Sequence, residues 1–232
     1  MQITFIARKL NISGGGSNFS LDLMARSLAE RGNDVTIVTV KSNMNDLPPE
    51  PPYRVVESGS PVPRTRIGEL KRVYHLMREH SHMTDIFHVF APAYLAPAGY
   101  LRSTTDSPPT VGRLNNYGLF CTNTTKMDGE CHLNCGTGSK FAHDSVPLTR
   151  KITKIPLYAT QTHLEARYAK KLDRYFAISP SIKSMYSDIG LEEQKIEVVP
   201  NFYDPGFPSG GEAASLWNSN MPQVLYVGRL IG

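Results

Sequence analysis

The first forty residues constrain the fold most, because they read as a strand, a glycine loop, a helix and a second strand. Residues 2–7 are a short apolar run, which is typical of a strand buried on both faces of a sheet. Apolar residues then recur at helical spacing over residues 19–29, with Ser17 or Asn18 expected to cap the helix. The pair Arg31-Gly32 is expected to end this helix before a second apolar run at residues 34–40. This order predicts a βαβ unit in a parallel sheet.

The glycine loop, Gly14 to Gly16, predicts a phosphate-bearing ligand. Glycines let the backbone approach a ligand closely, and the N-terminus of the following helix favours an anion. The alternative is a tight turn without a ligand. A Walker loop would end in Gly-Lys-Ser/Thr, whereas Ser17 follows Gly16 here. A dinucleotide fingerprint would need a small residue at Phe19 and an acid at Lys41, so a nicotinamide cofactor is not expected.

Composition narrows the classes of partner and the compartment. The net charge of +4 on 232 residues permits attraction to an anionic membrane or a phosphate substrate, but is too weak to favour nucleic acid. No apolar run is long enough to span a bilayer, and the first residues lack the pattern of an export signal. We therefore expect a cytoplasmic protein.

Strand-like and helix-like segments alternate along the rest of the chain. This alternation predicts an α/β fold with a Rossmann-like parallel sheet flanked by helices. The expected strands are residues 53–56, 85–90, 109–114, 172–179, 195–199 and 224–230, and the expected helices are residues 67–83, 91–101, 149–171 and 180–189.

Three segments carry candidate functional residues. The helix at 67–83 is basic and amphipathic, so it can lie on anionic lipid, although such charges more often face water. His88 lies in the strand at 85–90, where a lone histidine is most often structural. Asn115 and Asn116 follow the strand at 109–114, at the edge of a parallel sheet where ligands collect.

The cysteines form a cluster rather than a disulfide framework. Cys121, Cys131 and Cys135 lie in a glycine-rich segment, and their odd number does not suggest a secreted scaffold. His132 or His143 could supply a fourth ligand to a structural zinc ion, but the spacing is not that of a zinc finger or ribbon. Reduced thiols in a compact loop are the alternative, and we expect no metal.

Motifs spread over nearly the whole chain give it a resemblance to the retaining glycosyltransferases of family 4. Those motifs are the glycine loop, Asp-Ile-Phe-His-Val at 85–89, Phe-Ala-Ile-Ser-Pro-Ser at 176–181, Val-Pro-Asn-x-x-Asp at 199–204, and Val-Gly-Arg-Leu at 227–230. The cysteine segment is also similar to one found in part of that family.

The resemblance implies a GT-B architecture of two Rossmann-like domains. Gly15 and Gly16 would contact the phosphates of a UDP- or GDP-sugar donor, and Arg229 would neutralise the leaving diphosphate. Asn115 stands where family members usually carry a histidine, and an asparagine side chain can hydrogen-bond but cannot take a proton. His88 and Asn116 would contact the acceptor. No tightly bound cofactor is implied.

The resemblance also divides the chain. Residues 1–204 would form the acceptor-side domain, residues 205–222 a linker, and residues 223–232 the first strand of a donor-binding domain that is otherwise absent. The lysine and the Glu-x7-Glu motif expected after Gly-Arg-Leu are missing. We therefore expect no sugar transfer by this polypeptide alone, and a separately encoded second half would be its partner.

The leading hypothesis is the N-terminal half of a glycosyltransferase with a glycan, lipid-linked or protein-linked acceptor, on the inner face of the membrane or free in the cytoplasm. A second hypothesis is a non-catalytic protein that binds an acceptor or lipid with the same fold. A third is a different Rossmann-like enzyme that uses the cysteine cluster.

Overall fold

A computed structural model of the chain describes residues 1–11, 16–40, 50–59, 65–121, 136–144 and 146–201. Residues Met1–Phe202 form one compact unit. The predicted linker, the predicted strand at 223–232 and the domain boundary at 204 lie outside the described residues, so they stay predictions.

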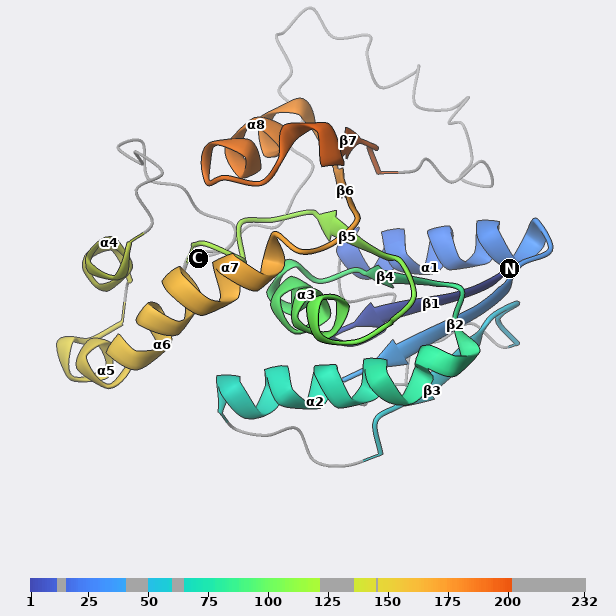
Figure 1. Cartoon of the computed structure of the whole chain (residues 1–232), viewed down its shortest axis with the longest axis horizontal. Coiled ribbons are helices and arrows are strands. Elements are labelled where there is room, and N and C mark those ends of the chain that lie inside the picture. Colours follow the sequence, from blue (N-terminus) through green and yellow to red (C-terminus); the bar gives the residue numbers. More distant parts are fainter. Residues whose placement is uncertain (12–15, 41–49, 60–64, 122–135, 145, 202–232) are drawn as a thin grey trace, which may run out of the picture. The chain divides into compact units, whose positions relative to one another are not determined.

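The unit is built on one seven-stranded sheet in which every neighbouring pair is parallel, in the order β3-β2-β1-β4-β5-β6-β7 (Figure 1). The predicted Rossmann-like α/β class is thereby confirmed. The strands are β1 (Gln2–Ala7), β2 (Asp34–Thr39), β3 (Arg54–Glu57), β4 (Ile86–Val89), β5 (Thr110–Leu114), β6 (Arg174–Ala177) and β7 (Ile196–Val198).

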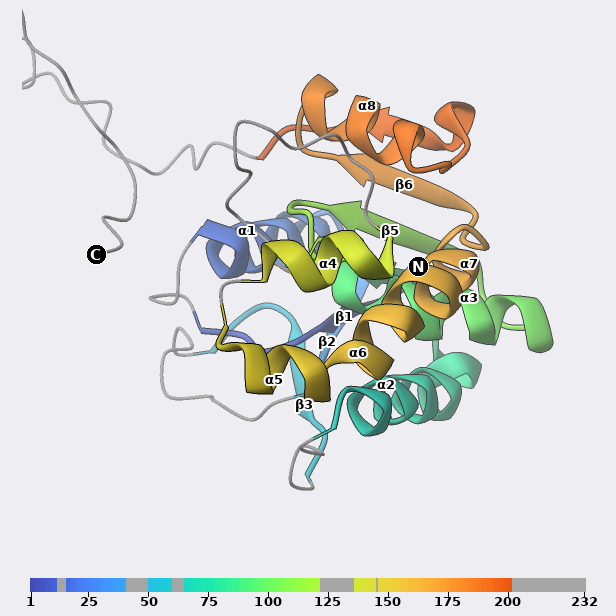
Figure 2. The same cartoon turned by 90° about the vertical axis from the view of Figure 1, so that its left-hand side faces the viewer.

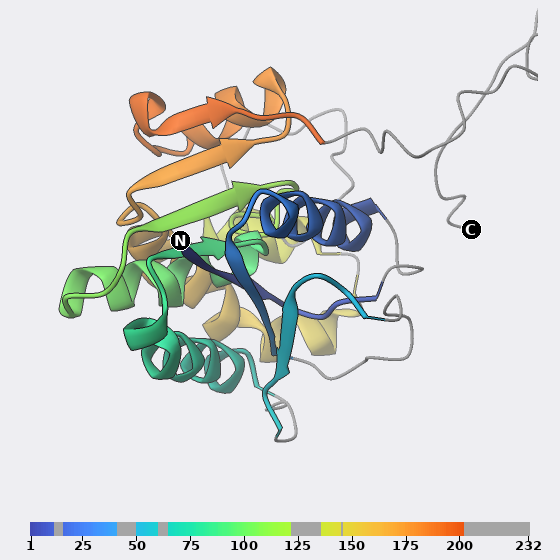
Figure 3. The same ribbon diagram turned by 90° about the vertical axis from the view of Figure 1, so that its right-hand side faces the viewer.

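Helices flank both faces of this sheet (Figures 1 and 3). One face packs against α1, through Leu21, Met24 and Ala25, and the other against α2, α3, α7 and α8. The helices are α1 (Gly16–Glu30), α2 (Arg66–His80), α3 (Leu95–Thr104), α4 (Thr137–His143), α5 (Leu148–Thr153), α6 (Ile155–Ala159), α7 (Ala166–Ala169) and α8 (Pro180–Asp188), with a π-helical turn η4 (Thr160–Glu165) between α6 and α7.

The central position of β1 explains its composition. Five of its six residues are buried, because β2 and β4 pair with its two edges and helices cover both faces. The predicted first strand, at residues 2–7, is confirmed to the residue.

The first helix is confirmed, but its start differs from the prediction. It begins at Gly16, so Ser17 and Asn18 lie inside the first turn and do not cap it. Its end is as predicted: Gly32 adopts a positive φ of 82°, and the amides of Gly32 and Asn33 donate to the carbonyls of Ala29 and Leu28.

The predicted basic helix at 67–83 is observed as α2, followed by a 3-10 turn at Ser81–Met83. Val73 and Met77 of its apolar stripe are fully buried in the core of the sheet, whereas Ile67 is 66% exposed. The stripe is therefore used mainly for folding.

The predicted helical region at 149–171 is observed as α5, α6, η4 and α7, and its last turn ends at Ala169. The short helix α4 was not predicted, because it directly follows the cysteine segment and contains a glycine. None of the helices in the described part of the chain combines the length and the apolar character that a membrane span needs.

Candidate functional site at the carboxyl edge of the sheet

Three segments that are distant in sequence meet at the carboxyl edge of the central strands. The first turn of α1, the residue after β4 and the residue after β5 come together through Ser17, Phe90 and Asn115. This is the edge at which open parallel sheets bind ligands.

The amide of Asn115 is the link between them. Its Nδ2 donates to Ser17 Oγ at 3.1 Å and to the Phe90 carbonyl oxygen at 3.4 Å. Its Oδ1 accepts from Asn116 Nδ2 at 3.0 Å. Asn115 therefore positions the start of α1 against β4 and β5, a role that the sequence alone did not reveal.

Asn116 shapes the turn that follows. Its Oδ1 accepts from the amide of Gly118 at 2.8 Å, and its carbonyl oxygen accepts from the Tyr186 hydroxyl of α8 at 2.7 Å. The two asparagines predicted as site residues are thus neighbours in one hydrogen-bonded turn. The predicted contact between Asn116 and an acceptor stays a prediction.

Gly16 is the predicted phosphate-binding residue that the structure describes. A Cβ added to it would meet no described atom within 4 Å. Packing of the described residues therefore does not require glycine here, and the predicted contact of Gly16 with phosphate stays a prediction. Gly15 and Arg229, the other predicted phosphate ligands, lie outside the described residues.

His88 is placed inside the molecule rather than at the sheet edge. Its side chain is 5% exposed, stacks on Phe5 with ring centroids 4.9 Å apart, and meets Phe176 edge-on. Burial, with the charge of Arg113 as a second cause, lowers the pKa of His88 to about 3. The ring is thus neutral at physiological pH, which favours the structural alternative over the predicted contact with an acceptor.

Arg113 is a site residue that sequence reasoning missed. This β5 side chain is fully buried and lies over the ring of Phe90 at 5.9 Å. Its Nη2 donates to Asn201 Oδ1 at 3.0 Å, whereas its Nε and Nη1 have no hydrogen-bond partner among the described residues. Burial lowers its pKa. The signal was present in the sequence, as an arginine inside an apolar strand.

Asn201 belongs to the Val-Pro-Asn-x-x-Asp motif, so the bond from Arg113 ties that motif to the centre of the sheet. The same guanidinium group reaches the Pro200 carbonyl oxygen at 3.5 Å. Among the described residues, no carboxylate lies within ion-pair distance of Arg113. This edge of the sheet therefore carries uncompensated positive charge.

A second cation lies at the end of β1, before the glycine loop. Arg8 is 57% exposed, and its Nε lies 3.5 Å from the carboxylate of Glu69 in α2. The Tyr94 hydroxyl donates to the same carboxylate at 2.6 Å, and burial raises the pKa of Tyr94. The ion pair with Glu69 thus directs Arg8 toward α2.

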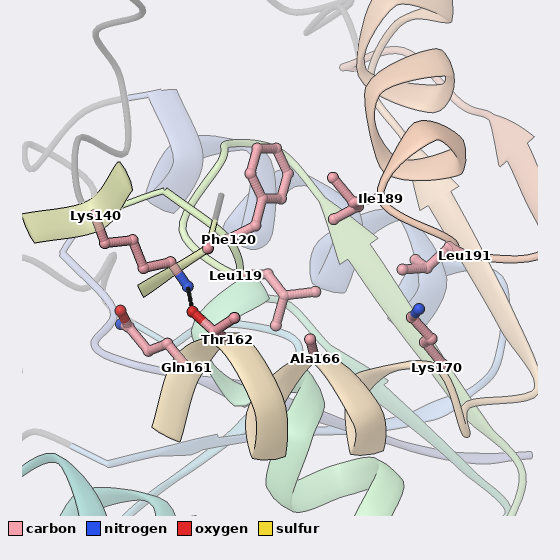
Figure 4. A pocket seen from close by; sticks show the side chains of 10 residues that line it. Leu119, Phe120, Lys140, Gln161, Thr162, Ala166, Lys170, Ile189 and Leu191 are labelled. Carbon is pink, nitrogen blue, oxygen red and sulfur yellow. Dashed lines mark hydrogen bonds between the residues drawn. The ribbon is translucent and has the colours of Figure 1, made fainter. Parts of the chain in front are cut away.

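A separate pocket of about 310 Å³ lies between α4, η4 and the loop after α8 (Figure 4). Lys140 reaches across its mouth and donates to Thr162 Oγ1 at 3.1 Å. Most of its other lining is apolar: Leu119, Phe120, Ala166, Ile189 and Leu191. Lys170 is a second lysine in its lining, and neither Gly16 nor Asn115 lines it.

The zinc hypothesis falls mostly outside the described residues. Cys121 is half-buried, whereas Cys131, Cys135 and His132 are not described. Within the described ranges, no three potential ligands from histidine, cysteine, aspartate or glutamate come together.

Comparison with known proteins decides the family. The family model described as Glycosyltransferase Family 4 matches residues 14–207. The chain belongs to this family. No curated protein matches the sequence.

Solved structures show the same fold. HepE of Anabaena, in complex with UDP, superimposes with a TM-score of 0.53 at 13% identity, over 88% of this chain and 45% of that one. Sucrose-phosphate synthase of Thermosynechococcus elongatus gives 0.54 at 15% identity, over 86% of this chain and 47% of that one. The fold is that of the N-terminal domain of a GT-B glycosyltransferase. The chain spans less than half the length of these structures.

Proposed function

We propose that this family 4 chain is the acceptor-side domain of a retaining glycosyltransferase that moves a sugar from a UDP- or GDP-sugar to a glycan, lipid-linked or protein-linked acceptor. The observation that carries the proposal is the Asn115 amide, which fixes the first turn of α1 at the carboxyl edge of β4 and β5. That geometry presents the start of a helix, and its favourable field for anions, to the ligand edge of the sheet.

The donor phosphates would lie against Gly15 and Gly16, with Arg229 on the leaving diphosphate. The open space at Gly16 supports this placement. The structure of HepE has been solved with UDP and with UDP-glucose. Of the two candidate donors, we therefore favour a UDP-sugar over a GDP-sugar. Positive groups at a leaving diphosphate stabilise charge that grows in the transition state.

Asn115 would act in this reaction by position and not by proton transfer. Its amide hydrogen-bonds Ser17, Phe90 and Asn116, all within the protein, and an asparagine cannot take a proton. Asn115 would then hold the start of α1 in place relative to the bound acceptor. Correct positioning of reacting groups by itself raises the rate of transfer.

Transfer would require the donor-binding domain, either encoded separately or joined in a longer chain. The first experiment is calorimetric titration of the chain with UDP-glucose and GDP-mannose, alone and mixed with a candidate second half, together with an assay of nucleoside diphosphate release. We expect release only in the mixture.

Gly16→Asp supplies the site-specific control. A carboxylate at the start of α1 would repel a diphosphate, so donor affinity should fall at least tenfold, whereas Gly138→Asp in α4 should leave it unchanged. Equal loss in both variants, or none in Gly16→Asp, contradicts the predicted phosphate site.

The alternative function is non-catalytic binding of an acceptor or lipid. The internal hydrogen bonding of Asn115, at the position of the family's histidine, favours it. Binding of a glycan by the folded chain, without donor binding in any mixture, would establish this alternative. Under either function we propose a cytoplasmic protein on the inner face of a membrane.

A further inference from the structure

Exposed apolar side chains gather at one side of the molecule, where the helices after the cysteine segment approach α2. Half of the exposed large apolar residues in the described ranges belong to this group. They are Ile67 (66% exposed) in α2, Leu148 (63%) and Ile152 (54%) in α5, Ile155 (42%) in α6 and Leu164 (53%) in η4. Figure 2 shows α5, α6 and α2 next to one another on the side facing the viewer.

The spacing within the segment is amphipathic. Leu148, Ile152 and Ile155 follow one another at four and three positions, which places them along one side of a helical segment. None of the six residues of α5 is buried. The core therefore does not account for these apolar side chains.

The charges of the same segment are almost all positive. Residues 147–171 contain six lysines and arginines and a single acid, Glu165. Glu165 is 1% exposed and is bound by Arg66 at 2.8 Å. Arg150, Arg167 and Lys171 are exposed. The segment thus presents cations and apolar groups to solvent without an exposed carboxylate.

The apolar surface continues into a groove of about 530 Å³ between α2, α3 and α7. Its walls include Tyr74, Tyr100 and Tyr168, whose rings touch in series with centroids 5.5 Å and 5.0 Å apart. Ile67 and Leu164 stand on its rim. Tyrosines of this kind suit the boundary between water and lipid, because one end is apolar and the other polar.

We propose that this surface, made of α5, α6, η4 and the start of α2, docks on a bilayer that contains anionic lipid. We call it the α5–η4 surface. Leu148, Ile152 and Leu164 would enter the headgroup region, and Arg150, Arg167 and Lys171 would meet lipid phosphates. A lipid surface is favoured over a protein because every exposed charge within residues 147–171 is positive. The exposed carboxylate of Glu192 lies beside Arg167 and Lys171 in a neighbouring pocket, away from Leu148 and Ile152 in sequence and not among the residues of the groove.

The proposal revises the place where the sequence suggested membrane contact. The helix at 67–83 directs Val73 and Met77 into the core, so these apolar side chains are not available to contact lipid. This inference deepens the location part of the proposed function and does not depend on sugar transfer.

The test is co-sedimentation of the full chain with vesicles of phosphatidylcholine alone or with about one-third phosphatidylglycerol, a charge density that attracts basic segments. We expect binding to the anionic vesicles, and its loss in high salt. The double variant Leu148→Ser/Ile152→Ser should bind at least tenfold more weakly. Met83→Ser changes a 42% exposed side chain outside this surface and should bind like the wild type.

A second pair of variants tests the charges. Arg150→Glu/Arg167→Glu should abolish binding, whereas Arg31→Glu, an exposed arginine after α1 on the other face of the sheet, should reduce it little. Circular dichroism confirms that each variant is folded. Equal binding to neutral vesicles, or unchanged binding in both multiple variants, overturns the proposal. A concentration-dependent dimer that Ile152→Ser disrupts would do the same, because it would assign the surface to a second copy of the chain.

The vesicle experiment does not depend on the outcome of the donor titration. Each of the two proposals can therefore be contradicted without the other.

Discussion

At the scale of single residues, the buried pair of His88 and Arg113 is the least ordinary feature. Both side chains lie on the sheet face that packs against α1, and atoms of both lack hydrogen-bond partners among the described residues. A second positive charge on His88 would stand beside a guanidinium group in a site that water does not reach. The neutral ring is therefore a condition for the native packing.

This condition predicts a pH dependence of stability. The pKa of His88 is about 3 in the folded chain, below the unfolded value of about 6.5, so only the unfolded state gains the proton between these values. The neutral His88 ring therefore contributes stability that is fully present above the unfolded pKa and is lost as the pH falls below it. We expect a loss of about 2 kcal/mol between pH 7.5 and pH 5.

Urea unfolding at the two pH values measures this loss. The variant His88→Phe keeps an aromatic ring in the cluster but cannot take a proton. The change in its free energy of unfolding between pH 7.5 and pH 5 should therefore be smaller by about 2 kcal/mol. An identical pH dependence in His88→Phe would show that other groups cause it.

The Ser17–Asn115 bond predicts energetic coupling between α1 and the loop after β5. In a double-mutant cycle with Ser17→Ala and Asn115→Ala, the coupling energy should be about 1 kcal/mol, the usual net value of a neutral hydrogen bond. Chemical unfolding of the four proteins gives this quantity. Additive effects would mean that the bond contributes nothing in solution.

At the scale of elements, the periodicity of apolar residues predicted where most strands and helices lie, but local sequence did not predict the cap of α1 or the short helix α4. The strand at 2–7 was predicted to the residue because its residues are mostly apolar, with β-branched or aromatic side chains at four of six positions, a composition that favours a buried strand. The cap of α1 was mistaken because Gly16 can itself adopt helical angles, so the capping residues Ser17 and Asn18 were drawn into the first turn. Helix α4 was missed because it directly follows the cysteine segment, contains a glycine and, with seven residues, is too short to show an apolar stripe.

The contact between α3 and α7 depends on one glycine. A Cβ on Gly99 would lie 1.8 Å from the carbonyl oxygen of Tyr168, a backbone atom that cannot move aside alone. We expect Gly99→Ala to lower the free energy of unfolding by about 1–3 kcal/mol through overpacking.

Gly138→Ala in α4 is the matched control for this prediction. Its Cβ would meet nothing within 4 Å, so higher helix propensity should raise stability by up to about 1 kcal/mol. Thermal unfolding compares the two variants. A stable Gly99→Ala protein would mean that α3 and α7 separate more easily than their packing suggests.

At the scale of the whole molecule, the strand order predicts a gradient of local stability. The central strands β1 and β4 are paired on both edges, whereas β7 has three residues and ends the described sheet. Amide hydrogen exchange should therefore be slowest in β1 and β4 and faster by orders of magnitude in β7. Equal protection of β7 would show that another segment covers its open edge.

The arrangement of the whole sheet also explains which parts of the candidate site could be predicted from the sequence. The edge after β5 was predicted, since a parallel sheet gathers its loops there, and Asn115 and Asn116 do lie in it. The Arg113–Asn201 and Asn115–Ser17 bonds were not, because their partners lie 88 and 98 residues apart along the chain. Spacing in sequence carries no information on such pairs until the strand order is known.

The central place of β1 also has a consequence in time. Its partner β4 begins at Ile86, which pairs with Ile3, so one edge of β1 stays open during synthesis until some eighty more residues have been added. At a synthesis rate of about 5–20 residues per second, that interval lasts roughly 4–16 s. During it, an apolar strand with an unpaired edge is exposed to other nascent chains. Chaperone contact during that interval would therefore shield the open edge of β1 from other nascent chains.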